Sequence, residues 1–315
     1  MQKNFDASPI SPLMYFISMK PVELNFPSYQ FTSILGWSIS RFEVFDKCKR
    51  QYFYQYYSKH VKDVPNYKLS ILKELTSAAL EVGNVVHDCM EVLLKRLQQS
   101  DSKIDEERFF RFADEKLKEY FSKKTFIEVY YGQTSSIDIL SASEKVKTCL
   151  QNFLNSPCFS WIYMKAIFHR TGWMIEPPGY GETRLDGMKA YCKMDFLFPV
   201  GDEVYILDWK TGSKDMSKHA AQLMGYAVAA NSNFSIPWNR IFPKIIYLNP
   251  QYDELEITFG EQELKNFFET IRTQTEEMYS FCRDVDQNLP RDISEFPASP
   301  SPGLCRNCKF QQLCL

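Results

Sequence analysis

The stretch that decides the fold is AYCKMDFLFPVGDEVYILDWKTG, residues Ala190 to Gly212. It contains two apolar runs separated by Gly201 and Asp202. A two-residue connection that begins with glycine is typical of a tight β-hairpin with a primed turn. If the loop is only these two residues, Val200 pairs with Glu203, and this pairing sets the register of both strands.

Counting outward from the turn, this register places Asp195 directly opposite Asp208, with their Cβ atoms about 5 Å apart. Side chains alternate between faces along a strand, so Lys210 shares the face of Asp208 and Trp209 points to the other face. Two facing carboxylates repel each other unless a cation lies between them, and buried charges are normally paired or bound to metal. Magnesium typically takes one or two carboxylates together with water and substrate phosphate. The pattern therefore predicts a divalent-metal site with an adjacent lysine.

An alternative is an edge hairpin in which Asp195 and Lys210 are solvated and Asp208 forms a surface ion pair. The distribution of apolar residues disfavours this alternative, because both faces carry them. One face would hold Met194, Phe196, Phe198, Tyr205 and Leu207, and the carboxylate face would hold Leu197, Val204 and Ile206. We therefore expect both faces of the hairpin to be buried.

The whole chain has the composition of a globular protein. Its 315 residues are 44% hydrophobic and 15% aromatic, which fits one or two domains with a substantial core. The net charge of −2 argues neither for nor against a nucleic-acid partner, so that question rests on local features. We find neither a membrane-spanning apolar run nor a convincing signal-peptide pattern, and we expect a cytoplasmic protein with no membrane partner.

The chain divides into a lead-in segment, residues 1–36, and a single domain, residues 37–315. Within the domain we expect a helical part at about 37–155, a sheet-containing core at about 170–285 and a tail at 286–315. Hydrophobic spacing predicts helical segments at 69–99, 103–154, 216–230 and 261–282, and strands at 173–176, 244–248 and 254–258.

The segment Trp37–His60 mixes basic and aromatic side chains. Ser40 and Glu43 are spaced as a capping box at the start of a helix. Lys47, Lys49 and Arg50 flank Cys48, and Tyr52, Phe53, Tyr54, Tyr56 and Tyr57 follow. Such a mixture could bind single-stranded nucleic acid through phosphate contacts and base stacking. A helix with a packed aromatic face and a solvated basic face explains the pattern at least equally well.

His87 lies beside an apolar stripe on the helix predicted at 69–99. The stripe consists of Val86, Met90, Leu93 and Leu97, at helical spacing. Gly83, one turn before His87, costs about 1 kcal/mol relative to alanine in a helix, so its presence suggests close approach by another group. A lone histidine on a helix is more often structural than a ligand, and these residues alone leave its role open.

The C-terminal tail contains a cysteine motif. Cys305, Cys308 and Cys314 form the pattern C-x2-C-x5-C, which is a strong signal for metal or cluster ligation. Both zinc and an iron–sulfur cluster usually need four ligands. We favour Cys48 as the fourth because charged residues flank it. The other five cysteines lie singly in apolar surroundings, as small buried side chains do.

Together these motifs resemble the RecB-like branch of the PD-(D/E)XK nuclease superfamily. Within that branch the resemblance is to members with a four-cysteine iron–sulfur cluster, the AddB-type nuclease domain and the CRISPR-associated RecB-like exonucleases. The family motif G-x-x-x-H matches Gly83 and His87, and the metal-binding Asp matches Asp195. Further along the chain, D-x-K matches Asp208 and Lys210, and Q-x-x-x-Y matches Gln222 and Tyr226. The split cluster motif matches Cys48, Cys305, Cys308 and Cys314. The outer acidic residue of the family maps to Glu176 or Glu182.

The resemblance implies an α/β fold with a central mixed sheet flanked by helices, a helical insertion, and a cysteine cluster joining the N-terminal helix to the tail. It implies a Mg²⁺- or Mn²⁺-dependent deoxyribonuclease, an exonuclease on single-stranded DNA or DNA ends. His87, Asp195 and Asp208 would hold the metal, and Lys210, Gln222 and Tyr226 would complete the catalytic set.

The resemblance also bears on cofactors and partners. A [4Fe–4S] cluster becomes the expected occupant of the cysteine site, ahead of zinc, and a helicase or a CRISPR-adaptation protein becomes a candidate partner. The alternative function is a catalytically silent DNA-binding or assembly subunit. Retention of Asp208 and Lys210 argues against this alternative. A small-molecule hydrolase is disfavoured because the sequence has no Gly-rich loop for a phosphate.

Overall fold

The predicted hairpin lies at the centre of a five-stranded sheet. The computed structural model describes residues 22, 24–177 and 181–314, so most of the expected lead-in segment lies outside the described residues. The strands are β1 (Met174–Ile175), β4 (Phe196–Val200), β5 (Glu203–Lys210), β6 (Ile241–Tyr247) and β7 (Asp253–Glu256), in the order β1-β4-β5-β6-β7. β5 and β6 are parallel, and the other neighbours are antiparallel. The sheet is therefore mixed, as predicted.

The register of the hairpin is the predicted one. Val200 lies opposite Glu203, and Phe196 lies opposite Leu207. Gly201 has a φ of +64°, which suits the first central position of a type II′ turn, where glycine is preferred. The register and the turn agree, and the next residues outward are Asp195 and Asp208.

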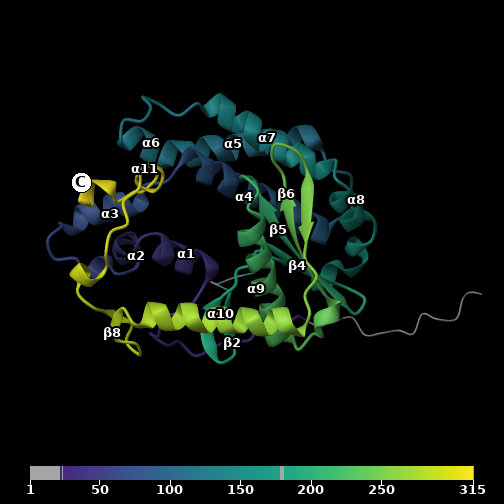
Figure 1. Cartoon of the computed structure of the whole chain (residues 1–315). Coiled ribbons are helices and arrows are strands. Elements are labelled where there is room, and N and C mark those ends of the chain that lie inside the picture. Colours follow the sequence, from purple (N-terminus) through teal and green to yellow (C-terminus); the bar gives the residue numbers. More distant parts are fainter. Residues whose placement is uncertain (1–21, 23, 178–180, 315) are drawn as a thin grey trace, which may run out of the picture.

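Helices cover both faces of the sheet (Figure 1). The helices are α1 (Ile39–Lys47), α2 (Lys49–Tyr56), α3 (Asn66–Glu74), α4 (Ala78–Gln99), α5 (Glu106–Lys123), α6 (Ile127–Tyr130), α7 (Ile139–Leu154), α8 (Pro157–Met164), α9 (Met216–Phe234), α10 (Glu261–Tyr279) and α11 (Pro302–Arg306). Short 3-10 helices span Ser58–His60, Ala166–Gly172, Trp238–Arg240, Ile293–Glu295 and Gln311–Leu313. Two small hairpins, β2 (Glu182–Leu185) with β3 (Met188–Tyr191) and β8 (Cys282–Asp284) with β9 (Leu289–Pro290), complete the fold.

Two separate apolar clusters occupy the two faces. Leu197, Val204 and Ile206 pack with the α9 side, together with residues of α1 and α10. Phe196, Phe198, Leu207 and Trp209 pack with the α4, α5 and α7 side. Both faces of the hairpin are thus buried. Met194 was predicted on the Phe196 face, but it packs in the α9 cluster, because the chain enters the strand only at Phe196.

The N-terminal helical segment differs from the prediction in two ways. The N-cap of α1 is Ser38, whose hydroxyl accepts from Arg41 N at 3.1 Å, so the predicted capping box of Ser40 and Glu43 is wrong. The helix also breaks at Cys48, which has an extended backbone and caps both α1 and α2. The break turns the Cys48 side chain out of a regular helical face.

Most of the aromatic side chains in this segment belong to the core. Tyr52, Phe53, Tyr54 and Tyr57 are all buried, so the packed-helix interpretation holds for these four. Tyr56 is 37% exposed and is the exception. At the other end of the chain, the helix predicted to Cys282 ends at Tyr279, and Cys282 begins β8. None of the helices within the described ranges is both long and apolar enough to cross a bilayer.

Candidate active site

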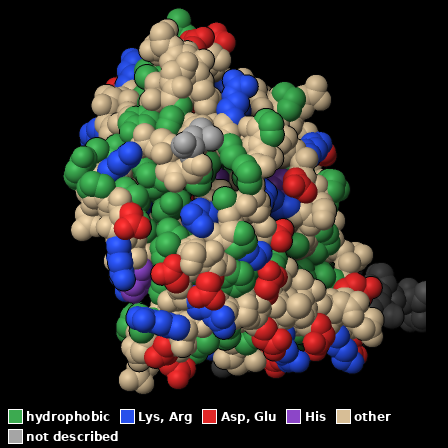
Figure 2. Space-filling view, turned by 60° about the vertical axis from the view of Figure 1, so that its left-hand side comes forward, with side chains coloured by type: hydrophobic (Ala, Val, Ile, Leu, Met, Phe, Trp, Pro, Cys, Tyr) green, Lys and Arg blue, Asp and Glu red, His purple; other side chains and the backbone are tan. Residues whose placement is uncertain are grey.

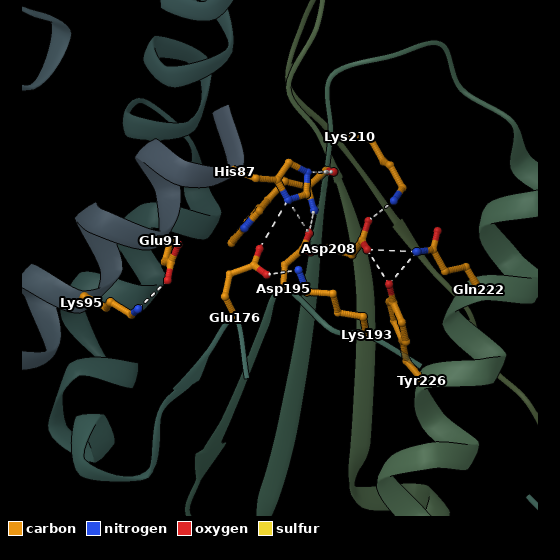
Figure 3. A network of polar contacts seen from close by, with 11 residues as sticks. His87, Glu91, Lys95, Glu176, Lys193, Asp195, Asp208, Lys210, Gln222 and Tyr226 are labelled. Atoms are coloured by element: carbon orange, nitrogen blue, oxygen red, sulfur yellow. Dashed lines mark hydrogen bonds and ion pairs between the residues drawn. The ribbon is translucent and has the colours of Figure 1, made fainter. Parts of the chain in front are cut away.

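The polar residues singled out in the sequence converge at one end of the central hairpin (Figure 3). Asp208 and Lys210 lie at the end of β5, and Asp195 directly precedes β4. α4 contributes His87 from one side, and α9 contributes Gln222 and Tyr226 from the other. Six of the matched motif residues therefore meet across three layers of the fold.

Asp208 is 2% exposed. Its Oδ1 accepts hydrogen bonds from Gln222 Nε2 at 3.0 Å and from Tyr226 Oη at 2.5 Å. Its Oδ2 is enclosed and forms an ion pair with the Lys210 ammonium. Burial and the nearby Asp195 carboxylate raise the pKa of Asp208 to about 6. A cation would relieve this cost, because it would favour the charged carboxylate.

Asp195 is held differently. Its Oδ2 accepts from the backbone N–H of Trp209 at 2.9 Å, and its carbonyl oxygen accepts from Glu176 N at 2.8 Å. Burial raises the pKa of Asp195, but the charge of His87 and the hydrogen bonds outweigh burial and hold this pKa below its usual value. Neighbouring carboxylates whose environments push their pKa values apart are typical of catalytic sites.

His87 points one ring nitrogen at the carboxylates. Its Nδ1 lies 3.4 Å from Asp195 Oδ2 and 3.6 Å from Glu176 Oε1, and its Nε2 lies 3.1 Å from the carbonyl oxygen of Trp209. An Nε2–H that donates to Trp209 O leaves Nδ1 free to bind a cation. Burial lowers the pKa of His87, but Asp195 and Glu176 outweigh burial and raise it to about 10. Metal binding would displace this proton.

Glu176 lies at the site, and Glu182 does not. Ligand atoms of His87, Glu176 and Asp195 all lie within 4.8 Å of one another, whereas Glu182 on β2 forms an ion pair with Arg184. Glu176 has a φ of +43°, which is uncommon for a residue with a side chain and marks a functional or strained position. Oxygen donors of this kind suit Mg²⁺ and Mn²⁺, and an imidazole is compatible with them. The residues present therefore fit a divalent cation.

One residue at the site, Lys193, went unnoticed in the sequence. Lys193 Nζ lies 2.8 Å from Glu176 Oε2; the signal was its place two residues before Asp195, on the same side of an extended chain. Thr211 is the group that approaches Gly83: a Cβ at Gly83 would lie 3.4 Å from Thr211 Oγ1. This distance is an ordinary van der Waals contact, so it does not by itself require a glycine at this position.

Cys308 of the tail lies near Cys48, Cys305 and Cys314. Among the described residues, however, no three of these thiols lie close enough to one another to form a metal-binding group. Burial and the neighbouring Cys314, Cys48 and Cys305 thiols raise the pKa of Cys308 to about 11. Arg50 ties α2 to the tail: its N and Nε donate to Pro297 O at 3.1 Å and to Phe296 O at 2.8 Å. All nine cysteines lie in the described ranges and are free thiols, and the five outside this group are buried.

The chain was compared with known proteins in two ways. A search of curated proteins finds no match to the chain. The family model of the PD-(D/E)XK nuclease superfamily matches residues 36–315, a stretch that contains every residue of the site described above. The chain belongs to the PD-(D/E)XK nuclease superfamily.

Proposed function

We propose that this protein is a metal-dependent deoxyribonuclease that hydrolyses phosphodiester bonds of DNA, with single-stranded DNA or DNA ends as the substrate. The observation that carries the proposal is the pair of neighbouring buried carboxylates, Asp195 and Asp208, with the Lys210 ammonium paired to Asp208 Oδ2. Neighbouring buried carboxylates disfavour each other's charge unless cations lie close to both. A divalent cation would offset this charge and leave Lys210 available to a phosphate.

His87, Asp195 and Asp208 are the proposed metal ligands, and Glu176 is the outer acidic residue. When bound, Mg²⁺ or Mn²⁺ would supply Lewis acidity toward the scissile phosphate and a more acidic water. The protein's part is to hold the ligands: Trp209 fixes Asp195 through its N–H and His87 through its carbonyl oxygen. A single residue of β5 thereby orients two of the proposed ligands.

Lys210 is proposed to orient the attacking water or to stabilise the charge that builds on the phosphate. Electrostatic contributions of this kind are typically worth about 3–4 kcal/mol. Its ammonium is already next to Asp208 and is only partly exposed, so little rearrangement is needed. Gln222 and Tyr226 hold the other oxygen of Asp208, which keeps Oδ2 directed at the cation and at Lys210.

The four-cysteine site is proposed to hold a structural [4Fe–4S] cluster, ahead of zinc. Support comes from its place in the fold, because it joins the α1–α2 junction to the C-terminal tail. Hydrolysis needs no redox chemistry, so the simplest role for the cluster is to hold the two ends of the domain together. Exonuclease action and a helicase or CRISPR-adaptation partner remain part of the proposal through the RecB-like resemblance.

The experiment is a cleavage assay on protein purified without oxygen. End-labelled single- and double-stranded DNA would be incubated with Mg²⁺, Mn²⁺ or EDTA, alongside Lys210→Ala and Lys265→Ala. Lys265 is a matched control because it pairs with Glu261 on the surface of α10. We expect metal-dependent cleavage by the wild type and Lys265→Ala, with loss in Lys210→Ala. A folded wild type that binds DNA without cutting it would favour the silent-subunit alternative.

A further inference from the structure

A cleft of about 700 Å³ opens beside the candidate metal site, between the start of α1 and the face of α9. Lys193 and Lys210 line this cleft and also line the neighbouring cavity that contains His87 and Asp195. The two spaces therefore adjoin each other at these lysines. Trp37 holds the start of α1 in place, because its N–H donates to Lys189 O at 2.9 Å and its carbonyl accepts from Tyr191 N at 2.8 Å.

The two spaces differ in charge. Arg41, Lys193, Lys210 and Lys218 line the cleft, and no Asp or Glu is among the described residues that line it. The neighbouring cavity is instead lined by Asp88, Glu91, Glu176 and Asp195 in addition to lysines. On the outer surface the two signs are interspersed, as the lower half of Figure 2 shows. Four cationic side chains thus line the cleft, where an anion would meet them, although Lys193, Lys210 and Lys218 also pair with Glu176, Asp208 and Glu43.

Arg41 is the unusual member of this set. Its Nε donates to Tyr52 Oη at 3.1 Å, its Nη1 donates to Gly36 O at 3.3 Å, and its guanidinium stacks on the Tyr56 ring at 4.4 Å. Among the described residues, no carboxylate lies within ion-pair distance of it. By contrast, Lys218 pairs with Glu43 at 2.7 Å.

An arginine without a carboxylate has a specific consequence. A half-buried guanidinium without a carboxylate partner keeps its positive charge available to an anionic ligand, and the neighbouring Tyr52 and Tyr56 favour that charged form. Its planar fork of N–H donors fits a phosphate well, and side chains already fixed by packing lose little entropy on binding. The contacts to Tyr52, Gly36 and Tyr56 fix Arg41 in advance of any ligand.

We propose that this cleft is the subsite for the nucleotides adjoining the scissile phosphate, and that it takes a single strand. Arg41 and Lys218 bind a backbone phosphate, and the partly exposed Tyr56 ring offers a surface to a base. Grooves that combine cations with aromatic rings are the common means of binding single-stranded nucleic acid without sequence preference. The inference rests on the proposed nuclease function and adds the side of the site from which the strand approaches.

Binding in EDTA tests the proposal separately from catalysis, because the proposed function predicts no cleavage without metal. The affinity of a fluorescent oligothymidylate would be measured by anisotropy at several salt concentrations. Each phosphate contact to a single strand contributes about 0.7 to the slope of log affinity against log salt. We expect Arg41→Gln and Lys218→Gln each to reduce that slope by about 0.7, and Arg41→Lys to restore it.

Arg108→Gln is the matched control, because Arg108 is exposed on α5 and does not line the cleft. It should leave the slope unchanged. Unchanged slopes in Arg41→Gln and Lys218→Gln would overturn the subsite, as would a wild type that does not bind the oligothymidylate or that prefers duplex DNA. If Arg41→Gln fails to fold, Lys218→Gln decides the matter alone. A wild type that cleaves no DNA, with variants that show the predicted changes in salt slope, would refute the nuclease function and still support the strand-binding cleft.

Discussion

Tyr226 donates a 2.5 Å hydrogen bond to Oδ1 of Asp208, and Gln222 Nε2 lies within hydrogen-bonding distance of both groups, at 2.5 Å from the tyrosine oxygen and 3.0 Å from the carboxylate (Figure 3). The three groups form a closed triangle between α9 and β5. Both donors use Oδ1, which holds that oxygen toward α9 and leaves Oδ2 directed at Lys210. The spacing Q-x-x-x-Y therefore has a geometric meaning here: one turn of α9 clamps one oxygen of the central aspartate.

Removal of the tyrosine hydroxyl should weaken catalysis more than binding. Hydrogen bonds to charged groups contribute about 1.5–3 kcal/mol, so Tyr226→Phe is expected to lower kcat roughly tenfold or more while KM for DNA changes little. Tyr252→Phe, whose hydroxyl pairs with Glu254 away from the site, is the control. A Tyr226→Phe enzyme with the wild-type kcat would show that the hydrogen bond from Tyr226 to Asp208 does not contribute to catalysis.

One pair of variants can decide whether Glu176 or Glu182 is the outer acidic residue of the site. Glu176→Gln should raise the Mn²⁺ concentration needed for half-maximal cleavage by about 10–100-fold, the usual effect of losing a supporting group at a metal site. Glu182→Gln removes the same charge from a residue that pairs with Arg184 and should change nothing. Equal metal requirements in both variants would exclude Glu176 from the site.

His87 gives the metal-free protein a pH dependence of known sign. Its pKa is raised to about 10 in the folded chain from an ordinary value near 6.5. A raised pKa means that the stabilisation is complete below about pH 6.5 and is lost as the pH rises toward 10. The melting temperature of the wild type in EDTA should therefore fall toward that of His87→Gln over this range. A difference that widens with rising pH would contradict this assignment.

The cysteine site predicts a link between iron and stability. Cys308→Ala should lose its iron and melt several degrees lower, because a ligand that binds only the folded state stabilises it and 1 kcal/mol corresponds to about 2–4 °C in chains of 150–250 residues. Cys149→Ala, a buried thiol far from the tail in sequence, should keep its iron. Zinc in place of iron on metal analysis would correct the cluster type, and an unchanged melting temperature would remove its structural role.

The central hairpin could be predicted because its signals are local. The glycine turn fixes the register, and alternation then places Asp195, Asp208 and Lys210 without reference to the rest of the chain. The two-residue period fails where the strand ends, which is why Met194 was assigned to the wrong face. The functional roles of Gln222 and Tyr226 stay predictions, although their contacts with Asp208 are present.

What could not be predicted depends on contacts between distant segments. Ser38 and Ser40 are both acceptable N-caps, and the choice of Ser38 follows from where the chain leaves its pairing with β3. In the part of the chain that the structure describes, the absence of a carboxylate beside Arg41 is likewise a property of the fold, which brings Tyr52 and Gly36 to the guanidinium instead. Sequence spacing contains neither fact.

The most direct test of the account is the single-turnover rate of DNA cleavage by Asp208→Asn in saturating Mn²⁺, compared with the wild type. The substitution keeps the size of the side chain and removes the charge that the proposed cation needs. We predict a rate at least about 100-fold lower, in keeping with the loss of several kcal/mol of transition-state stabilisation, in a protein that still binds single-stranded DNA. Metal-dependent cleavage by Asp208→Asn at the wild-type rate would contradict the account.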